Sequence, residues 1–365
     1  MGCFIIYVIL FPLMFCLQWC RKKATGHLII QTAKIGDYAN TTPMISYLGK
    51  TDMVIDDINR AFADYDERIE TIYCINTYKK GILLKLKLAW ILYTRHYEKV
   101  YVVMPNSLNL FLGLCCYAKE TTTLHTYASK WYFFLLSYRM KVIHHHVHDL
   151  TIHSYLSMID EGISATRYWK QLQQPLYIPK SPRAFDNKFR IGLSLSAGNK
   201  IKTIDQKTWD ILFSILNKLD CVIYVFGLKS ENVYLEKLQE HVHSTNPIIS
   251  LLGEMELKEL PYYISHMHLY ISSDTGNSYV ADSVKTPTIN FAGPCFWQEQ
   301  RPLLETSLVI PSNALCAPYS SVFITSHEIK SSDLYDVSEN QVYEIEQFIH
   351  FLYKSFLSNQ HTVSN

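Results

Sequence analysis

Three stretches of the sequence place small and polar side chains where an apolar, strand-like run ends and a helical pattern begins. They are "KIGDYANTTP" with Gly36 and Asp37, "SLSAGNKIK" with Ser196, Gly198 and Lys202, and "ISSDTGNS" with Asp274, Thr275 and Gly276. Open α/β proteins bind their ligands at the carboxyl ends of strands. The pattern therefore predicts three parts of a ligand site.

The second and third stretches favour an anion. Lys200 and Lys202 follow small residues, and backbone N–H groups near Thr275 and Gly276 would point out of a helix start. The spacing of a P-loop is absent, and two loop lysines are also compatible with simple solvation. Asp274 is negative, so it would meet sugar hydroxyls or accept N–H bonds of its loop rather than touch a phosphate.

Asp37 in the first stretch has two interpretations. Its carboxylate could cap the helix that follows, which is the commonest role of an acid at such a position. It could instead lie at the end of the first strand and face a cleft between domains. The residues alone leave both interpretations open.

A histidine-rich stretch, "HHHVHDLTIH", follows at residues 144–153. In a strand, His144, His146 and His148 would share one face, and Asp149 lies nearby. The sequence has no HExxH motif and no cysteine beside these histidines, so a strand that ends in a loop is the favoured interpretation and no metal site is predicted.

Composition limits the classes of partner. The chain has 365 residues and a net charge of +1, with no polybasic helix or acidic tail, and this gives no indication of a nucleic-acid partner. Nine cysteines are scattered without a CxxC pair, which is typical of buried free thiols in a reducing compartment.

Strand-like and helical runs alternate in two series, which predicts an α/β fold of two doubly wound, Rossmann-like domains facing a cleft. Residues 24–172 form the first predicted domain and 191–357 the second. Three prolines mark 173–190 as a linker, Ser338 and Gln341 form a capping-box pattern before the last helix, and 358–365 is a polar tail expected to fray.

The N-terminus is strongly apolar. Residues 3–20 carry no charge, Trp19 lies near their end, and Arg21, Lys22 and Lys23 follow. The run is just long enough for a bilayer, and the following cations would keep the rest of the chain in the cytoplasm. We expect residues 1–23 to form a membrane anchor helix; a peripheral helix or a start codon assigned too early are the alternatives.

Five motifs in order, between about residues 28 and 300, resemble glycosyltransferase family 9, the heptosyltransferases of lipopolysaccharide core assembly. The motifs are "IIQTAKIGDYANTTPMISYL", "IGLSLSAGNKIKTIDQKTWDILFSIL", "VIYVFGLKSENV", "LLGEMELKELPYYI" and "SSDTGNSYVADSVKTPTINFAGP". Two positions depart from the family pattern, because Tyr279 stands where the family usually has His and Ile204 where it usually has an aromatic residue. These departures weaken heptose as the donor sugar.

The resemblance implies a GT-B fold and an inverting transfer that needs no metal or other cofactor. It places a nucleotide-sugar donor in the second domain and a lipid-linked oligosaccharide acceptor in the first, at the cytoplasmic face of the inner membrane. It implies these roles: Asp37 as catalytic base; Lys202 at the phosphates; Glu231 at the ribose; Asp274, Thr275, Gly276, Ser196 and Gly198 as donor-binding; Gly36, Thr41 and Thr42 on the acceptor side.

Two other functions remain open at this point. A non-catalytic homologue could bind a glycan or a nucleotide sugar, and Tyr279 favours it, whereas Asp37 and Lys202 count against it. A nucleotide-sugar epimerase of the same fold would act on the free nucleotide sugar and would need no membrane anchor.

Overall fold

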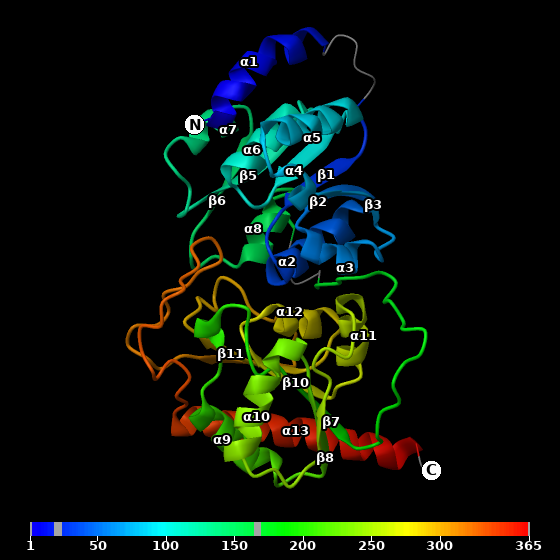
Figure 1. Ribbon diagram of the computed structural model, residues 1–365, viewed down its shortest axis with the longest axis vertical. Coiled ribbons are helices and arrows are strands. Elements are labelled where there is room, and N and C mark those ends of the chain that lie inside the picture. The colour runs from blue at the N-terminus through cyan, green and yellow to red at the C-terminus, as the bar shows by residue number, and fades with distance from the viewer. Residues whose placement is uncertain (1, 18–23, 164–168, 364–365) are drawn as a thin grey trace. The chain divides into compact units, whose positions relative to one another are not determined.

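The computed structural model describes residues 2–17, 24–163 and 169–363. The chain divides into two compact units, Met1–Pro175 and Leu176–Asn365, and the division lies inside the stretch expected to be a linker. Each unit has its own sheet and its own hydrophobic core (Figure 1).

The bounds of the elements are as follows. The strands are β1 (His27–Gln31), β2 (Thr51–Ile55), β3 (Ile69–Cys74), β4 (Lys99–Val102), β5 (Glu120–Thr126), β6 (Lys141–His145), β7 (Phe189–Leu193), β8 (Cys221–Val225), β9 (Ile248–Ser250), β10 (Leu269–Ser273), β11 (Thr288–Gly293) and β12 (Ser307–Pro311). The α-helices are α1 (Gly2–Leu17), α2 (Ile35–Leu48), α3 (Arg60–Ala63), α4 (Ile75–Tyr78), α5 (Ile82–Arg95), α6 (Ser107–Cys115), α7 (Phe133–Ser137), α8 (Thr151–Ser157), α9 (Gln206–Leu216), α10 (Asn232–His241), α11 (Leu260–Ser265), α12 (Gly276–Ser283) and α13 (Glu339–Val363). Short 3-10 turns include η4 (Lys200–Lys202) and η5 (Lys229–Glu231).

Both sheets are parallel and are wound in the same way. The strand order is β3-β2-β1-β4-β5-β6 in the first unit and β12-β11-β10-β7-β8-β9 in the second. In each, the chain reverses its direction of winding between two central strands, β1 and β4 or β7 and β10. This confirms the predicted α/β class with two doubly wound sheets, and it fixes the two edges where ligands are expected.

Buried aliphatic residues explain why the strands form. All five residues of β8 and all five of β10 are buried, as expected for central strands covered on both faces. In the second unit α9 and α13 add Leu212, Ile345 and Ile349 to this core. In the first unit α5, α6 and α7 pack together on their sheet, and α1 adds Tyr7 and Met14 to the same cluster.

The N-terminal helix is α1, which ends at Leu17. Among the described residues, none of the helices combines the length and the apolarity that crossing a membrane requires. The expected anchor residues Trp19 and Arg21–Lys23 lie outside the described residues.

The last helix begins where the capping pattern predicts. The backbone N–H of Ser338 donates to the side chain of Gln341 at 2.9 Å, and the backbone N–H of Gln341 donates to the Ser338 hydroxyl at 3.3 Å. The helix continues to Val363, past residue 358, so the described part of the expected polar tail is helical. The Gln360 side chain donates to the carbonyl of Asn187 at 2.5 Å, a contact that holds the final turns of α13.

Candidate functional site

The second unit carries most of the predicted donor site at the point where its sheet changes winding direction. Strands β7 and β10 are neighbours there, and the loops after them diverge. The Ser194 hydroxyl lies 2.6 Å from the Tyr270 hydroxyl and accepts a hydrogen bond from the Asn277 side chain at 2.9 Å. These contacts hold the end of β7 against the start of α12.

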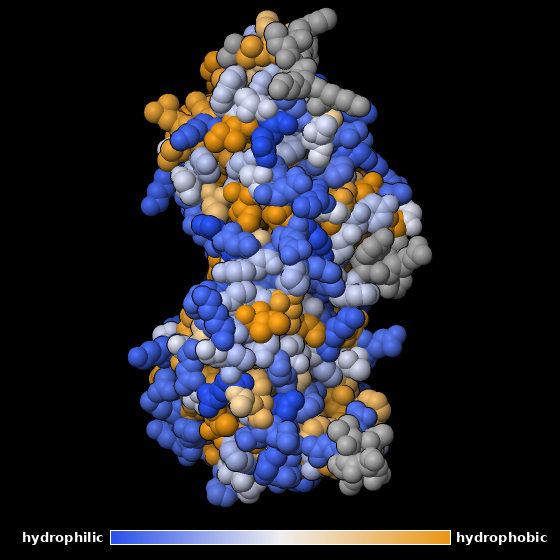
Figure 2. Space-filling model, turned by 90° about the vertical axis from the view of Figure 1, so that its right-hand side faces the viewer, coloured by the Kyte–Doolittle hydropathy of each residue, from blue (hydrophilic) through white to orange (hydrophobic). Residues whose placement is uncertain are grey.

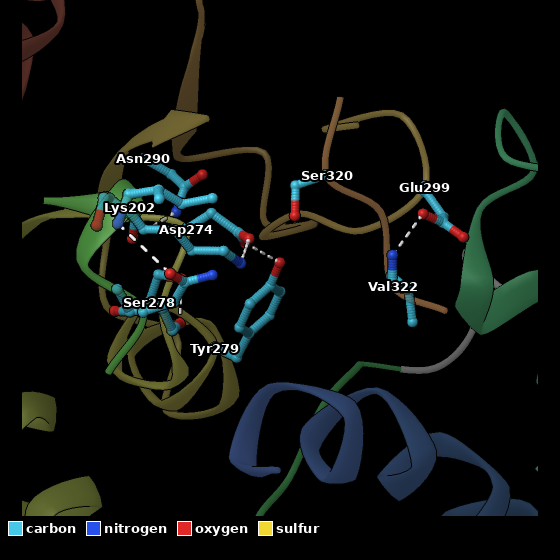
Figure 3. A network of polar contacts seen from close by, with 12 residues as sticks. Lys202, Asp274, Ser278, Tyr279, Asn290, Glu299, Ser320 and Val322 are labelled. Atoms are coloured by element: carbon cyan, nitrogen blue, oxygen red, sulfur yellow. Dashed lines mark hydrogen bonds and ion pairs between the residues drawn. The ribbon is translucent and has the colours of Figure 1, made fainter. Parts of the chain in front are cut away.

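A lysine–aspartate pair lies at the centre of this site (Figure 3). Lys202 Nζ is 2.7 Å from Asp274 Oδ2, and the two side chains are only 20% and 13% exposed. Tyr279 donates its hydroxyl proton to the other oxygen of the same carboxylate. The pair therefore joins the loop after β7 to the loop after β10.

The pair holds both groups in their charged forms. Burial acts to lower the pKa of Lys202, but the Asp274 carboxylate outweighs burial and raises it. Burial likewise acts to raise the pKa of Asp274, and the Lys202 ammonium and the Tyr279 hydroxyl hold it below its ordinary value. The Cys295 thiol contacts both groups and burial raises its pKa, so it remains a neutral thiol there.

The start of α12 has unused hydrogen-bonding capacity. Thr275 occupies the N-cap position, yet its side chain makes no capping hydrogen bond. Its hydroxyl oxygen is buried and has no hydrogen-bond partner. Backbone N–H groups at a helix start, with the unpaired hydroxyl of Thr275 next in sequence to the partner of Lys202, form an arrangement that suits the oxygens of a phosphate.

Glu231 is held in place on the adjacent loop, after β8. Ser196 donates its hydroxyl proton to one carboxylate oxygen, and the N–H of Leu228 donates to the other at 2.8 Å. A Cβ atom at Gly227 would lie 1.9 Å from that second oxygen, so a larger residue there would displace the Glu231 carboxylate from this position. Ser196 and Glu231 are thus brought together, whereas Gly198 is exposed and has no heavy atom within 4 Å of where a Cβ would lie.

In the first unit, Asp37 is the third residue of α2 and is partly exposed. The N-cap position belongs to Lys34, so the capping interpretation of Asp37 is wrong. Gln31 at the end of β1 is fully buried; it donates to the Thr41 hydroxyl at 3.1 Å and accepts from the N–H of Ala33 at 2.9 Å. These bonds fix the turn that carries the Asp37 carboxylate to the end of the strand.

The predicted acceptor-side residues make internal bonds. The Thr41 hydroxyl donates to the Asp37 carbonyl at 2.9 Å, and the Thr42 hydroxyl donates to the Ala39 carbonyl at 2.7 Å. Both threonines are fully buried, and the Gly36 carbonyl accepts from the Asn40 side chain at 2.9 Å. These residues hold the first turns of α2, and a contact with an acceptor stays a prediction.

The histidine stretch does not form the strand face that the alternation suggested. Strand β6 ends at His145, because the N–H of His146 donates to the Asp149 carboxylate at 2.7 Å and starts a turn. The His145 ring instead lies 2.8 Å from the Ser154 hydroxyl. Across residues 2–17, 24–163 and 169–363, no group of three or more His, Cys, Asp or Glu side chains could hold a metal ion.

The sequence predicts neither the pairing of Lys202 with Asp274 nor the contacts that Tyr279 and Cys295 make with this pair. Lys202 and Asp274 lie far apart in the sequence, and no local sequence pattern indicates that they form a pair. Tyr279 was noted only as a departure, although its position five residues after Asp274, one helical turn into α12, could have indicated a hydroxyl aimed back at the carboxylate. Cys295 was interpreted only as one of many apolar cysteines.

The two parallel doubly wound sheets, with loops that suit an anion after β7 and β10, place the chain among the two-domain α/β proteins that bind ligands where the winding reverses. The model of glycosyltransferase family 9, the heptosyltransferases, matches residues 95–321, and the chain belongs to that family. A search of curated proteins found no match.

Solved structures show the same fold at low sequence identity. A family 9 glycosyltransferase from Veillonella parvula has a TM-score of 0.64 at 15% identity, covering 91% of this chain and 98% of its own. The ADP-heptose lipopolysaccharide heptosyltransferase II of E. coli has a TM-score of 0.64 at 14% identity, covering 92% and 100%. The E. coli heptosyltransferase WaaC, solved with ADP, has a TM-score of 0.62 at 14% identity, covering 90% and 100%.

Proposed function

We propose that this glycosyltransferase moves a heptose or a related hexose-type sugar from a nucleoside-diphosphate donor to a lipid-linked oligosaccharide acceptor of the lipopolysaccharide core type. Donor binding is proposed on one observation, the Lys202–Asp274 pair beside the uncapped start of α12. Two similar E. coli proteins were solved as an ADP-heptose heptosyltransferase and with ADP, and this makes ADP-heptose the first donor to test.

The donor's diphosphate would lie against Lys202 and the first N–H groups of α12. The Thr275 hydroxyl is buried and unpaired, so a phosphate oxygen would give it the partner that it lacks. Asp274 keeps Lys202 protonated and fixed in place, and a preorganised cation needs no rearrangement as charge develops on the leaving group. Glu231, oriented by Ser196, would accept hydrogen bonds from the ribose hydroxyls.

The transfer step is an inverting displacement at the anomeric carbon. The acceptor oxygen attacks the face opposite the leaving group, the new C–O bond forms, and the bond to the diphosphate oxygen breaks. The proton of the acceptor hydroxyl goes to the Asp37 carboxylate, and the electron pair leaves with the nucleoside diphosphate. Asp37 is partly exposed in the first turn of α2, as a base that must reach an incoming hydroxyl needs to be.

The positive charge in this proposal comes from Lys202 and from the helix start, so the transfer would need no metal. The acceptor would be reached at the cytoplasmic face of the inner membrane, with the chain anchored or peripheral there. A non-catalytic homologue would bind the same donor without consuming it, and the experiment has to separate binding from transfer.

The test combines donor binding with product formation. ADP-, UDP-, GDP- and CMP-sugars are screened for an increase in the melting temperature, because a ligand that binds only the folded state stabilises it by mass action. The donor that stabilises most is then incubated with a lipooligosaccharide acceptor truncated in its core, with and without EDTA. We expect nucleoside diphosphate release and a heavier acceptor by mass spectrometry in both conditions.

Each other outcome identifies a different error. Binding without transfer to any truncated acceptor favours the non-catalytic homologue, and an isomerised donor without acceptor favours an epimerase. Activity abolished by EDTA and restored by a divalent cation contradicts the metal-independent mechanism.

A further inference from the structure

One face of the first unit is formed by α5, α6 and α7, and α1 packs on α6 (Figure 1). The Tyr7 hydroxyl of α1 is 3.4 Å from that of Tyr138, just after α7. The Tyr93 hydroxyl of α5 donates to the Met14 carbonyl at 2.8 Å. The inner side of α1 is therefore fixed to the unit, while its outer side is open.

The outer side of α1 is apolar. Ile5, Val8 and Ile9 are exposed, Ile9 at 72%, and the described part of this helix has no charged residue. A helix that only had to cover α6 would carry polar groups on its outer side. Figure 2 shows hydrophobic residues at the surface of this end of the first unit.

The start of α5 also exposes apolar side chains, and here lysines lie beside them. Lys79 and Lys80 are exposed, and after one glycine Ile82, Leu83 and Leu84 are exposed as well, Leu83 at 77%. Aliphatic side chains that are this exposed are not buried in the core of the unit, so they do not stabilise its fold. Two ammonium groups directly beside them are a combination typical of an interfacial segment.

The segment before and within α7 has the same character. Lys130 is exposed and is followed by Trp131, at 69% exposure, and then by exposed Phe134. The Tyr132 hydroxyl lies 3.3 Å from that of Ser107 at the start of α6, which places this segment on the same face as α5 and α6. Trp and Tyr are the aromatic residues that favour the boundary between water and lipid.

The charge of this part of the sequence is one-sided. Residues 71–148 contain ten lysines and arginines and only two acids, Glu98 and Glu120. The whole chain is close to neutral, so the positive charge is concentrated in the same stretch that exposes the apolar side chains. A hydrophobic surface for a second protein copy would gain nothing from a like-charged partner, whereas an anionic bilayer is complementary to both features.

We propose that the outer side of α1, the start of α5 and residues 130–138 together form a docking surface for a lipid bilayer with anionic headgroups. Ile9, Leu83, Trp131 and Phe134 enter the boundary of the acyl chains, and Lys79, Lys80 and Lys130 contact the headgroups. Docking needs no spanning helix. It also does not depend on the transfer reaction, because binding to vesicles is measured without donor or acceptor.

The test is co-sedimentation of the full chain with vesicles of phosphatidylcholine alone and of phosphatidylcholine with one-third phosphatidylglycerol. We expect binding to the anionic vesicles that weakens as salt is raised. Leu83→Ser with Phe134→Ser should lower the partition coefficient about tenfold or more. Lys79→Glu with Lys80→Glu should cause a similar loss that disappears on neutral vesicles.

Matched controls come from the second unit. Leu315 and Ile329 are exposed aliphatic residues in a segment that also contains Glu328 and Asp333, and Leu315→Ser with Ile329→Ser should leave binding unchanged. Lys237→Glu with Lys354→Glu is the charge control. All substituted side chains are exposed, and unchanged melting temperatures confirm folding.

Three results overturn the proposal. The wild type does not bind anionic vesicles, the controls lose as much binding as the docking variants, or all variants bind like the wild type. A wild-type dimer in sedimentation equilibrium that Leu83→Ser with Phe134→Ser dissociates would instead assign this face to a second copy.

Discussion

The two sheets have the same winding, but the residues where they change direction are chemically different. In the first unit, uncharged side chains bond the residues around the end of β1: Gln31 bonds Thr41, and Asn109 donates to the Thr32 hydroxyl and to the Met104 carbonyl, both at 2.8 Å. The ion pair in this turn, Lys34 with Asp56 at 3.4 Å, is formed by a lysine whose side chain is 73% exposed. In the second unit the equivalent loops are joined by the charged pair of Lys202 and Asp274. Asp37, partly exposed, lies in the first turn of α2 in the first unit.

This difference shows that the winding of the sheet determines where a ligand can bind, and that the side chains at that edge determine which chemistry is possible there. The network around Gln31 and Asn109 presents the Asp37 carboxylate beside a fixed turn, which suits proton removal from an acceptor. The charged pair fixes a cation and leaves a helix start uncapped, which suits an anion.

The largest effect is expected for Asp37→Asn in the first unit. Without its base the enzyme should lose a hundredfold to ten-thousandfold in kcat, while the donor still raises the melting temperature as in the wild type. The measurement is kcat from initial rates together with a thermal-shift titration of the donor. Asp64→Asn, an exposed acid of the same unit paired with Arg60, is the control and should be neutral. Near-normal turnover of Asp37→Asn would remove the base from the mechanism.

In the second unit, Lys202→Met should lower kcat/KM about a hundredfold and weaken donor binding as well. Lys200→Met is the matched control, because Lys200 lies on the same 3-10 turn but is exposed and should not matter. Initial rates and donor affinities of both variants test whether Lys202 contacts the donor phosphates. Equal behaviour of the two variants would show that the phosphate lies elsewhere.

The stability cost of breaking each network should differ between the units. Asp274→Asn leaves the Lys202 ammonium partly buried without its carboxylate, and we expect a loss of about 2–3 kcal/mol. Asn109→Ala in the first unit should cost only about 1 kcal/mol, because neutral hydrogen bonds are lost. Hydrogen exchange of peptides from β10 and β4 measures the two units separately. The double variant Lys202→Met with Asp274→Asn should recover part of the loss; strict additivity would show that the two groups do not interact.

Acid should destabilise the second unit through His268, which precedes β10. Its Nδ1 accepts from the N–H of Arg190 at 2.9 Å, and its ring stacks on Phe189. Burial, with a smaller contribution from the Arg190 guanidinium, lowers the pKa of His268 to about 4. The unfolded chain, with a pKa near 6.5, binds the proton first as the pH falls, so stability is lost from about pH 6.5 down to 4.

This loss should reach about 2 kcal/mol between pH 7 and pH 5. His268→Asn keeps an acceptor for the Arg190 N–H and should remove the slope, measured by hydrogen exchange of β10 peptides across this range. In the first unit, Glu98 opposes the effect of burial on the pKa of His27, so β1 should respond less. A slope that persists in His268→Asn would assign it to another group.

Much of the fold follows from the sequence because central strands are short, apolar and bounded by turn residues. The apolar runs before Gly36, Ser196 and Asp274, which form β1, β7 and β10, are visible in the sequence in this way. Strand β5 was missed because "ETTTLHT" looks polar, although Thr121, Thr122 and Thr123 are buried and β-branched. Strand β12 was missed as well, and there the run "SLVIP" is short and ends in proline.

The site was predicted in its parts but not in its contacts. Gly36–Asp37 and Asp274–Gly276 could be located because the strand ends before them are visible in sequence. The bond between Lys202 and Asp274 could not be predicted, since it depends on β7 and β10 becoming neighbours across the crossover. The burial of Thr41 and Thr42 was equally hidden, because a hydroxyl that bonds its own helix looks the same in sequence as one that faces a ligand.

The smallest effect is expected at Tyr279, where the second unit departs from its family. Tyr279→Phe removes one donor from the Asp274 carboxylate, whose pKa should rise toward its ordinary value, and should cost about 1 kcal/mol of stability. Tyr279→His restores the residue usual in the family and can still donate to Asp274, so it should cost less.

If Tyr279 also shapes the sugar pocket, the ranking of donors in kcat/KM will shift toward ADP-heptose in Tyr279→His but not in Tyr279→Phe. Tyr343→Phe on the exposed side of α13 is the control, and an unchanged ranking in Tyr279→His would confine Tyr279 to holding the carboxylate.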